Sequence, residues 1–310
     1  MNKILITGCS GFLASYLIKI FKEQDDNEIY GITEIPDFVS NEFKVFNIDI
    51  RERENVLKII EEIRPDIIFH LAAITNVGFS WKNQKLTYEV NFIGSLNIIE
   101  AVGKFSSSAR LVLMSSAELY GKNQGPVNEN SEVSIQNPYS LSKYSMELLG
   151  DIFVLSKNLN IIKIRSFNFT GSGQDKKFVC SDFAYQIAQI EKGEKDPVIK
   201  VGNLSVKRDF SDVRDIARYL SVISKKGETG KVYNLCSGHS YSIEEILEIL
   251  LEFSVKKIKI IVDKNKFRPS DIPVLSADCT LLREKFDLYP DIRIEETLLD
   301  LLNYWRRSGT

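Results

Sequence analysis

The hydrophobic positions in the first half of the chain follow two alternating patterns. Short runs rich in β-branched residues predict strands at 3–7, 28–33, 43–48, 66–72, 110–116 and 160–167. Between them, apolar residues recur at helical spacing and predict helices at 12–24, 53–64, 86–105 and 138–158. Strands that are apolar throughout and alternate with helices are typical of a parallel sheet covered on both faces. The pattern therefore predicts an α/β fold with a Rossmann-type, doubly wound parallel sheet.

The pattern changes after residue 170. A loop-rich stretch at 170–179 is followed by a helix at 180–193, a strand at 231–238 and a helix at 242–253. We interpret this part as a smaller, discontinuous C-terminal domain. The expected division is a large domain of residues 1–168 with parts of 207–238, and a small domain of residues 169–206 and 239–310.

Composition and charge narrow the class of function. Hydrophobic residues make up 44% and charged residues 26% of the chain, which is typical of a globular protein. Forty basic and forty-two acidic residues leave a net charge of −2, so we expect no nucleic-acid partner. The first strand-like run starts at Lys3 and no apolar stretch is long enough to cross a bilayer. We therefore expect a cytoplasmic protein that has no membrane partner.

Cysteines and histidines, the usual metal ligands and nucleophile–base residues, are few and scattered along the chain. Cys9, Cys180, Cys236 and Cys279 form no CxxC pair, so we expect free thiols in a reducing compartment and neither a metal site nor a disulfide. Because the chain has only two histidines, general base chemistry is expected to depend on another kind of side chain.

A glycine-rich turn, TGCSGFLA at 7–14, joins the first predicted strand to the first helix. Gly8 permits a tight turn, Gly11 lets the backbone approach a pyrophosphate, and Ala14 allows close packing of the helix. The helix start adds amide groups and a favourable dipole for an anion. The context of strand, turn and helix predicts a dinucleotide site here.

Acidic residues after the next two strands bear on the choice of dinucleotide. Glu34 follows the second strand, where a carboxylate can bond a ribose 2′-hydroxyl but repels a 2′-phosphate, and the next arginine is Arg51. This favours NAD over NADP, although Glu34 alternatively belongs to a solvated loop. Asp49 follows the third strand and is a candidate to hold the adenine, or alternatively an N-cap for the next helix.

The segment NPYSLSK at 137–143 places a tyrosine and a lysine on one helix face. Asn137 and Pro138 are typical of a helix start, and Tyr139 and Lys143 are four residues apart. Lowering the tyrosine pKa from ~10 to ~7 takes roughly 4 kcal/mol. One ammonium ~4 Å away at an effective dielectric of ~20 supplies about that amount. We therefore expect Lys143 to lower the pKa of Tyr139; the alternative is an ordinary helix with two polar, solvent-facing residues.

Polar residues also end the strand at 110–116. Ser115, Ser116 and Glu118 stand at its carboxyl end, the ligand-binding edge of such sheets. A serine hydroxyl there is placed to bond the same substrate oxygen as Tyr139, or alternatively to cap a turn.

Together these motifs resemble the extended short-chain dehydrogenase/reductase family, also described as NAD-dependent epimerases and dehydratases, over essentially the whole chain. HLAA at 70–73 resembles its fourth-strand signature, and Asn91 matches its structural asparagine, or alternatively marks a buried helix kink. The resemblance implies Ser116, Tyr139, Lys143 and Glu118 as catalytic residues. It also implies NAD(H) or NADP(H) bound by Gly8, Gly11, Phe12, Leu13, Glu34, Asp49, Ile50, Leu71, Ala72, Ala73, Asn91, Tyr139 and Lys143.

The second half resembles the branch of that family that acts on GDP-sugars, the GDP-mannose 4,6-dehydratases and the GDP-4-keto-6-deoxymannose reductases. The matching stretches are 165–174, 178–191, 201–215 and 268–273. They imply a GDP-sugar held by Asn168, Val179, Asn203, Arg208 and Arg268, with the two arginines on the diphosphate or alternatively in surface salt bridges. Ser172 stands where these relatives usually have proline.

The expected reaction is reduction of the C4 keto group of a GDP-4-keto-6-deoxy sugar to a GDP-6-deoxyhexose such as GDP-D-rhamnose. The stretch after the second strand lacks the basic cluster of the dehydratases, which favours the reductase. Glu118 suits both, so a 4,6-dehydratase or an epimerase is the alternative, and a catalytically silent nucleotide-sensing protein is an alternative of another class. The resemblance also implies a homodimer formed by the helices at 86–105 and 138–158, unless Leu148, Ile152 and Leu155 face the sheet.

Overall fold

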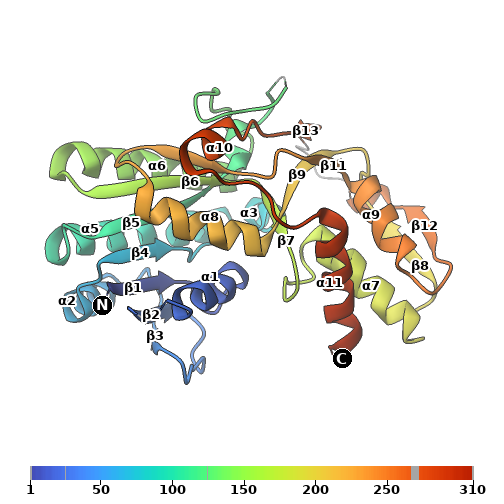
Figure 1. Cartoon of the computed structure of the whole chain (residues 1–310), viewed down its shortest axis with the longest axis horizontal. Helices are drawn as coiled ribbons and strands as arrows, with labels where there is room; N and C mark the ends of the chain where they lie inside the picture. Colours follow the sequence, from blue (N-terminus) through green and yellow to red (C-terminus); the bar gives the residue numbers. More distant parts are fainter. Residues whose placement is uncertain (1, 25, 124, 267–271, 309–310) are drawn as a thin grey trace.

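The computed structural model describes residues 2–24, 26–123, 125–266 and 272–308. Figure 1 shows two lobes, a large one built around a parallel sheet and a smaller one that carries the C-terminal helix. The chain begins in the large lobe and crosses between the two lobes several times before it ends in the small one.

The large lobe contains the doubly wound sheet that the sequence predicts. Seven parallel strands lie in the order β10-β6-β5-β4-β1-β2-β3. Their bounds are β1 (Asn2–Thr7), β2 (Asn27–Thr33), β3 (Lys44–Asn47), β4 (Ile67–His70), β5 (Arg110–Ser116), β6 (Asn160–Ser166) and β10 (Val232–Leu235). All six strands predicted in the first half are present, and the predicted fold class is confirmed.

Helices cover both faces of this sheet. One face carries α1 (Phe12–Lys22) and α8 (Val213–Lys226), and the other carries α2 (Arg53–Ile63), α5 (Ser95–Phe105) and α6 (Pro138–Lys157). Along β1, Ile4 and Ile6 belong to the first core and Leu5 to the second, as strand alternation requires. Among the described helices, none combines the length and the apolar composition needed to span a membrane.

The helix predicted at 86–105 is broken into pieces. Its pieces are α4 (Gln84–Tyr88), a π-helical turn (Glu89–Gly94) and α5, and a further short helix, α3 (Val77–Lys82), precedes them. Asn91 lies in the π-helical turn, so the buried kink considered from the sequence is present. Such turns frequently occur at functional sites.

The described residues of the small lobe form two small sheets and three helices. One sheet contains β7 (Asn168–Thr170), β9 (Lys207–Asp212), β11 (Ser240–Ser242) and β13 (Val274–Leu275), and the other pairs β8 (Val198–Val201) with β12 (Lys259–Val262). The helices are α7 (Val179–Glu191), α9 (Ile243–Glu252) and α11 (Ile294–Arg307), and they share one core. The short α10 (Thr280–Phe286) packs on β10 and α8 of the large lobe. The sequence analysis did not predict α8, α10 or α11.

Two of the four cysteines differ from the sequence-based expectation. Cys236, just after β10, and Cys279, just before α10, form a disulfide in the structure, so the expectation of four free thiols is wrong for this pair. They are 43 residues apart in the sequence, and only the packing of α10 against β10 brings them together. Cys9 and Cys180 are free and buried.

Candidate active site

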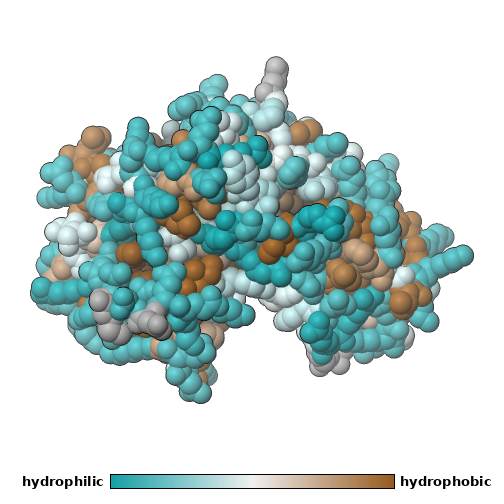
Figure 2. All heavy atoms as spheres, viewed as in Figure 1, coloured by the Kyte–Doolittle hydropathy of each residue, from teal (hydrophilic) through white to brown (hydrophobic). Residues whose placement is uncertain are grey.

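A cleft of about 1010 Å³ lies where the carboxyl ends of the central strands meet the small lobe. Its lining comes from the turns after β1, β2, β4 and β5 on one side and from β7, α7, β8 and β9 on the other. Figure 2 shows a hollow between the two lobes on a surface that is mostly hydrophilic. Ligands of doubly wound sheets bind at this edge.

The glycine-rich turn fits a pyrophosphate. Gly8 has φ +70°, and a Cβ on it would lie 2.9 Å from the backbone of Ala72, so only glycine suits this position. Gly11 is the N-cap of α1, which has neither a side-chain cap nor an acidic residue in its first turn. Together with Phe12 and Leu13, this uncapped helix start lines the cleft. A phosphate would satisfy its amide groups.

Acidic residues line the cleft beyond β2 and β3. Glu34 is exposed directly after β2, and Asp49 lies beside the buried Ile50. Arg51 donates to both carboxylate oxygens of Asp49, and this contact holds the pKa of Asp49 below its usual value. Asp49 is not the N-cap of α2; the N-cap is Glu52, whose side chain makes no capping hydrogen bond.

A buried hydrogen-bond chain supports the turn after β4. Ser95 donates to the carbonyl of Asn91, so the Nε2–H of His70 donates to Ser95. The Nδ1 atom of His70 then accepts from Thr7, whose oxygen accepts the backbone N–H of Ala72 at 3.1 Å. Burial, and next the charge of Lys143, lower the pKa of His70 to about 3. The chain fixes the segment that puts Leu71, Ala72 and Ala73 on the cleft wall.

Asn91 supports this wall from behind and does not line it. Its side-chain oxygen accepts the N–H of Ile74 at 2.8 Å, and its amide donates to the carbonyl of Ile74 and to Ser142 on α6, each at 2.9 Å. Every polar atom of the side chain is thus engaged by protein. The structure therefore differs from the expectation that Asn91 contacts the cofactor, and Asn91 instead holds the turn after β4 against α6.

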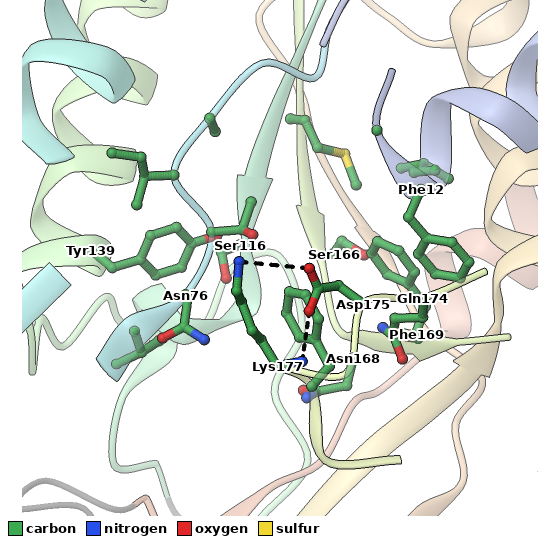
Figure 3. Close-up of a pocket in the computed structure, with 18 of the residues that line it drawn as sticks. Phe12, Asn76, Ser116, Tyr139, Ser166, Asn168, Phe169, Gln174, Asp175 and Lys177 are labelled. Atoms are coloured by element: carbon green, nitrogen blue, oxygen red, sulfur yellow. Dashed lines mark hydrogen bonds and ion pairs between the residues drawn. The ribbon is translucent and has the colours of Figure 1, made fainter. Parts of the chain in front are cut away.

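The start of α6 brings three candidate catalytic residues together. The side chain of Asn137 accepts the N–H of Ser140 at 2.8 Å, and Ser140 reciprocates, which fixes the first turn. Tyr139 and Lys143 are buried one turn apart and both line the cleft. Ser116, at the end of β5, also lines the cleft and lowers the pKa of the Tyr139 hydroxyl. Figure 3 shows Tyr139 and Ser116 meeting on one wall.

The charge states of this group differ from the sequence-based expectation. Burial raises the pKa of Tyr139 to about 12, although Ser116 opposes the rise. Lys143 donates to the carbonyl of Met114 at 2.7 Å, and burial lowers the pKa of Lys143 to about 8. The expectation that Lys143 brings the pKa of Tyr139 toward 7 is wrong in this structure, because it neglected the desolvation of the phenolate. The Tyr139 phenol is therefore protonated at neutral pH.

Glu118 lies at the same wall. It follows Ser116 by two residues, lines the cleft and accepts a hydrogen bond from the side-chain amide of Asn137 at 3.3 Å. The capping residue of α6 thus also orients this carboxylate.

The residues predicted to hold the substrate come from the small-lobe side. Asn168, Val179, Asn203 and Arg208 all line the cleft. The buried guanidinium of Arg208 donates to the carbonyls of Lys207 and Ile272 at 2.9 and 2.7 Å, which fixes its position. The predicted ligand Arg268 lies outside the described residues.

Several lining residues were missed by the sequence analysis. Figure 3 shows Lys177 projecting into the cleft between the wall of Ser116 and Tyr139 and the wall that carries Phe169. The Lys177 ammonium lies 3.6 Å from the carboxylate of Asp175. Other missed residues are Asn76, Ser166, Gln174, Lys176, Asp182 and Lys200. The only sequence signal was a charged loop directly after a predicted strand end.

Comparisons with known proteins match the whole length of the chain. The family model for GDP-mannose 4,6 dehydratase matches residues 5–301. The GDP-6-deoxy-D-mannose reductase of Pseudomonas aeruginosa is 28% identical over 98% of this chain and 97% of its own length. The GDP-6-deoxy-D-talose 4-dehydrogenase of Aggregatibacter actinomycetemcomitans is 30% identical over 89% of this chain and 88% of its own length. The structure of RMD from Pseudomonas aeruginosa complexed with NADPH has a TM-score of 0.87, with 26% identity and 99% of each chain covered.

Proposed function

The chain belongs to the GDP-mannose 4,6 dehydratase family, and we propose that it reduces the C4 keto group of a GDP-4-keto-6-deoxy sugar with NADH or NADPH. The product is a GDP-6-deoxyhexose such as GDP-D-rhamnose. The observation that carries the proposal is the meeting of Ser116, a protonated Tyr139 and Lys143 in one cleft that the glycine-rich turn also lines. The names of the two relatives, which both concern 6-deoxy GDP-sugars, support the substrate class.

The proposed reaction needs a hydride at C4 and a proton on the C4 oxygen. A reduced nicotinamide, when bound, supplies the hydride. Tyr139 donates the proton, and Ser116 donates a hydrogen bond that orients the carbonyl. Lys143, charged below a pKa of about 8, stabilises the phenolate that remains. We assign Glu118 to orientation of the sugar.

For the dinucleotide, we propose a preference for NADH over NADPH. The pyrophosphate would be held by the glycine-rich turn and the start of α1, at Gly8, Gly11, Phe12 and Leu13. The rest of the dinucleotide would lie along Ile50, Leu71, Ala72 and Ala73. Glu34 would bond the ribose hydroxyl and repel a 2′-phosphate. Arg51, the nearest arginine in sequence, is engaged by Asp49 and Glu89, which reduces its capacity to bind that phosphate.

For the sugar nucleotide, we propose that Arg208 binds the diphosphate, together with Arg268. Asn168, Val179 and Asn203 would contact the sugar and the nucleoside. Lys177 is a further cation for the same anion, because its ammonium stands in the cleft, where it pairs with the exposed carboxylate of Asp175 at 3.6 Å.

We also propose a cytoplasmic homodimer formed through the face of α6 that lies away from the sheet. Leu148, Ile152 and Leu155 do not face the sheet, since they are 46%, 57% and 84% exposed. Leu141 on the same helix and Ile93 in the neighbouring π-helical turn extend the apolar surface. Burying such a stripe against a second copy would remove it from water.

The test of the reaction is direct. The protein is mixed with GDP-4-keto-6-deoxymannose and either NADH or NADPH, and loss of reduced nicotinamide absorbance is followed, with product identified by mass. Consumption that depends on the keto sugar supports the proposal. Tight nucleotide binding without turnover would instead indicate the nucleotide-sensing protein, and the reductase assignment would fall.

The second candidate is a 4,6-dehydratase, favoured by Glu118. A carboxylate two residues after Ser116, in the cleft and oriented by Asn137, is placed to remove a proton next to a keto group. Incubation with GDP-mannose and no added reduced coenzyme distinguishes the two. A 4-keto sugar formed there would make the dehydratase the correct assignment.

A further inference from the structure

Helix α6 carries two acidic residues beyond Lys143, and both pair with cations on the adjacent strand β6. Glu147 and Asp151 follow Lys143 at intervals of four, so the three side chains share one face of the helix. Arg165 pairs with Glu147, and Lys163, two residues away on the same face of β6, pairs with Asp151. The inner pair is buried, with side chains 2% and 7% exposed, whereas Asp151 is 40% exposed.

The guanidinium of Arg165 fixes the Glu147 carboxylate. Its Nε donates to Oε1 at 3.0 Å and its terminal nitrogen donates to Oε2 at 2.8 Å. The Arg165 carbon Cζ lies 5.0 Å from the ring centre of Tyr120, whose hydroxyl donates to Asn234 at 2.7 Å. Because these charged hydrogen bonds are strong, the carboxylate does not turn toward Lys143 without losing them.

Lys143, in contrast to Glu147, carries a buried charge whose hydrogen bond goes to a neutral acceptor. Its ammonium bonds the carbonyl of Met114, which provides no compensating charge. Burial lowers the pKa of Lys143, and the charge of Glu147 opposes this effect. His70 on β4 is a titratable group near Lys143 outside α6, and it is neutral at working pH because burial lowers its pKa to about 3.

Two further titratable groups interact with Arg165. Tyr120 stacks on its guanidinium, and burial raises the pKa of Tyr120, so the phenol is neutral. Glu129 lies further out and accepts the backbone N–H of Asn234. Glu147 thus pairs directly with the buried Arg165 and follows the buried Lys143 by one helical turn.

We propose that Glu147 is a positioning residue that keeps the ammonium of Lys143 charged beside Tyr139, and that Arg165 limits this effect by sharing the carboxylate. The inference rests on the proposed function, in which a cationic Lys143 stabilises the phenolate of Tyr139. The division of one carboxylate between two cations sets the pH at which Lys143 loses its proton.

Two substitutions should move that pH in opposite directions. In Glu147→Gln, two buried cations face each other without a carboxylate, so Lys143 loses its proton about one pH unit lower. In Arg165→Met, the carboxylate is released to pair with Lys143, so the proton is lost about one unit higher. A pair with only a structural role would change stability in both variants without opposite shifts in the titration.

The titration is read by NMR of protein labelled with ¹³Cε-lysine, with the Lys143 signal assigned by its loss in Lys143→Arg. Asp151→Asn is the matched control, because it removes the next acid on the same helix face and should leave the signal in place. The measurement uses neither substrate nor coenzyme, so it is informative even if the reductase assay fails. If the enzyme is active, the pH above which its turnover falls should shift in each variant in the same direction as the Lys143 titration.

Shifts in the same direction for both variants, or no shift in either, would overturn the inference. If Glu147→Gln does not fold, Arg165→Met decides alone. If Arg165→Met does not fold either, Arg165→Lys replaces it, since a single ammonium does not hold both carboxylate oxygens as a guanidinium does. A smaller upward shift is then expected, and an unchanged or lower titration would contradict the proposal.

Discussion

The hydroxyl of Tyr16 donates a hydrogen bond to the carbonyl of Ser172, 2.7 Å away, and so joins α1 of the large lobe to the loop that enters the small lobe. The hydroxyl of Ser172 in turn donates to the carbonyl of Asp300 on α11 at 3.1 Å. The resemblance to enzymes that act on GDP-sugars implies proline at this position. The side chain of Ser172 thus makes a contact between the loop and α11 that proline cannot make.

Tyr16→Phe should lower the free energy of unfolding by about 1 kcal/mol, the usual net value of one such hydrogen bond. Urea unfolding followed by fluorescence measures the change. Tyr30→Phe is the control, because its hydroxyl bonds Glu28 two residues away on the same strand, and its loss should cost less. Equal effects in the two variants would mean that the contact between the lobes adds no stability.

Tyr139→Phe should reduce turnover by about 10²-fold or more while NADH affinity changes little, since the phenol is the proposed proton donor. Steady-state rates with the keto sugar and a fluorescence titration with NADH measure the two quantities. Tyr144→Phe, on the same helix, is the control. A rate close to that of the unmodified enzyme would remove Tyr139 from the proposed chemistry.

Glu34→Ala should raise the ratio of kcat/KM for NADPH to that for NADH by about tenfold, equivalent to about 1.4 kcal/mol. The reason is that a 2′-phosphate no longer meets a carboxylate, while the ribose hydroxyl loses an acceptor. Asp37→Ala is the control, because this exposed acid lies three residues further on and does not line the cleft. The proposal for Glu34 fails if both substitutions change the ratio equally.

His70 should make the protein less stable in acid. Its pKa is about 3 in the fold and near 6.5 in the unfolded chain, so between these values the unfolded state binds the extra proton. Stability from His70 is complete above about pH 6.5 and falls by about 1.4 kcal/mol per unit as the pH drops toward 3.

Asp209 acts in the opposite direction over part of this range, because burial raises the pKa of its carboxyl to about 6. The His70 effect is therefore best measured as a difference between the unmodified protein and His70→Gln in urea unfolding at pH 7.5 and pH 5. The stability gap between the two proteins should narrow at the lower pH. A constant gap would mean that the pKa of His70 is the same in the fold as in the unfolded chain.

Ile152→Glu combined with Leu155→Glu should convert a dimer into a monomer, because it places charge in the proposed apolar interface. Sedimentation velocity at micromolar concentration gives the mass. Val255→Glu is the control, since Val255 is 78% exposed on the small lobe and lies outside that face. A monomeric unmodified protein would contradict the proposed dimer.

The sequence predicted the architecture of the large lobe well, because its strands and helices have strong local periodicity. It also located Ser116, Tyr139 and Lys143, since a capped helix start and a strand end are local features. The charge state of Tyr139 was not predictable in this way, because desolvation depends on how α6 packs over β5. The pairing of Cys236 with Cys279 depends equally on contacts between distant segments.

Helix α8 was missed although Val213, Ile216, Leu220 and Ile223 recur at helical spacing, so the signal was present in the sequence. The role of Asn91 was ambiguous for a different reason. An asparagine that binds a ligand cannot be told from one that supports a turn by sequence alone. The hydrogen bonds of Asn91 to Ile74 and Ser142 distinguish the two roles.

The repeated crossing of the chain between the lobes has a consequence for engineering. The small lobe is assembled from stretches that are interrupted by α8, β10 and α10, all of which belong to the large lobe. No single cut in the polypeptide releases either lobe as one continuous piece. Chimaeras that exchange sugar preference between relatives must therefore graft several stretches at once, and simple truncations should yield insoluble protein.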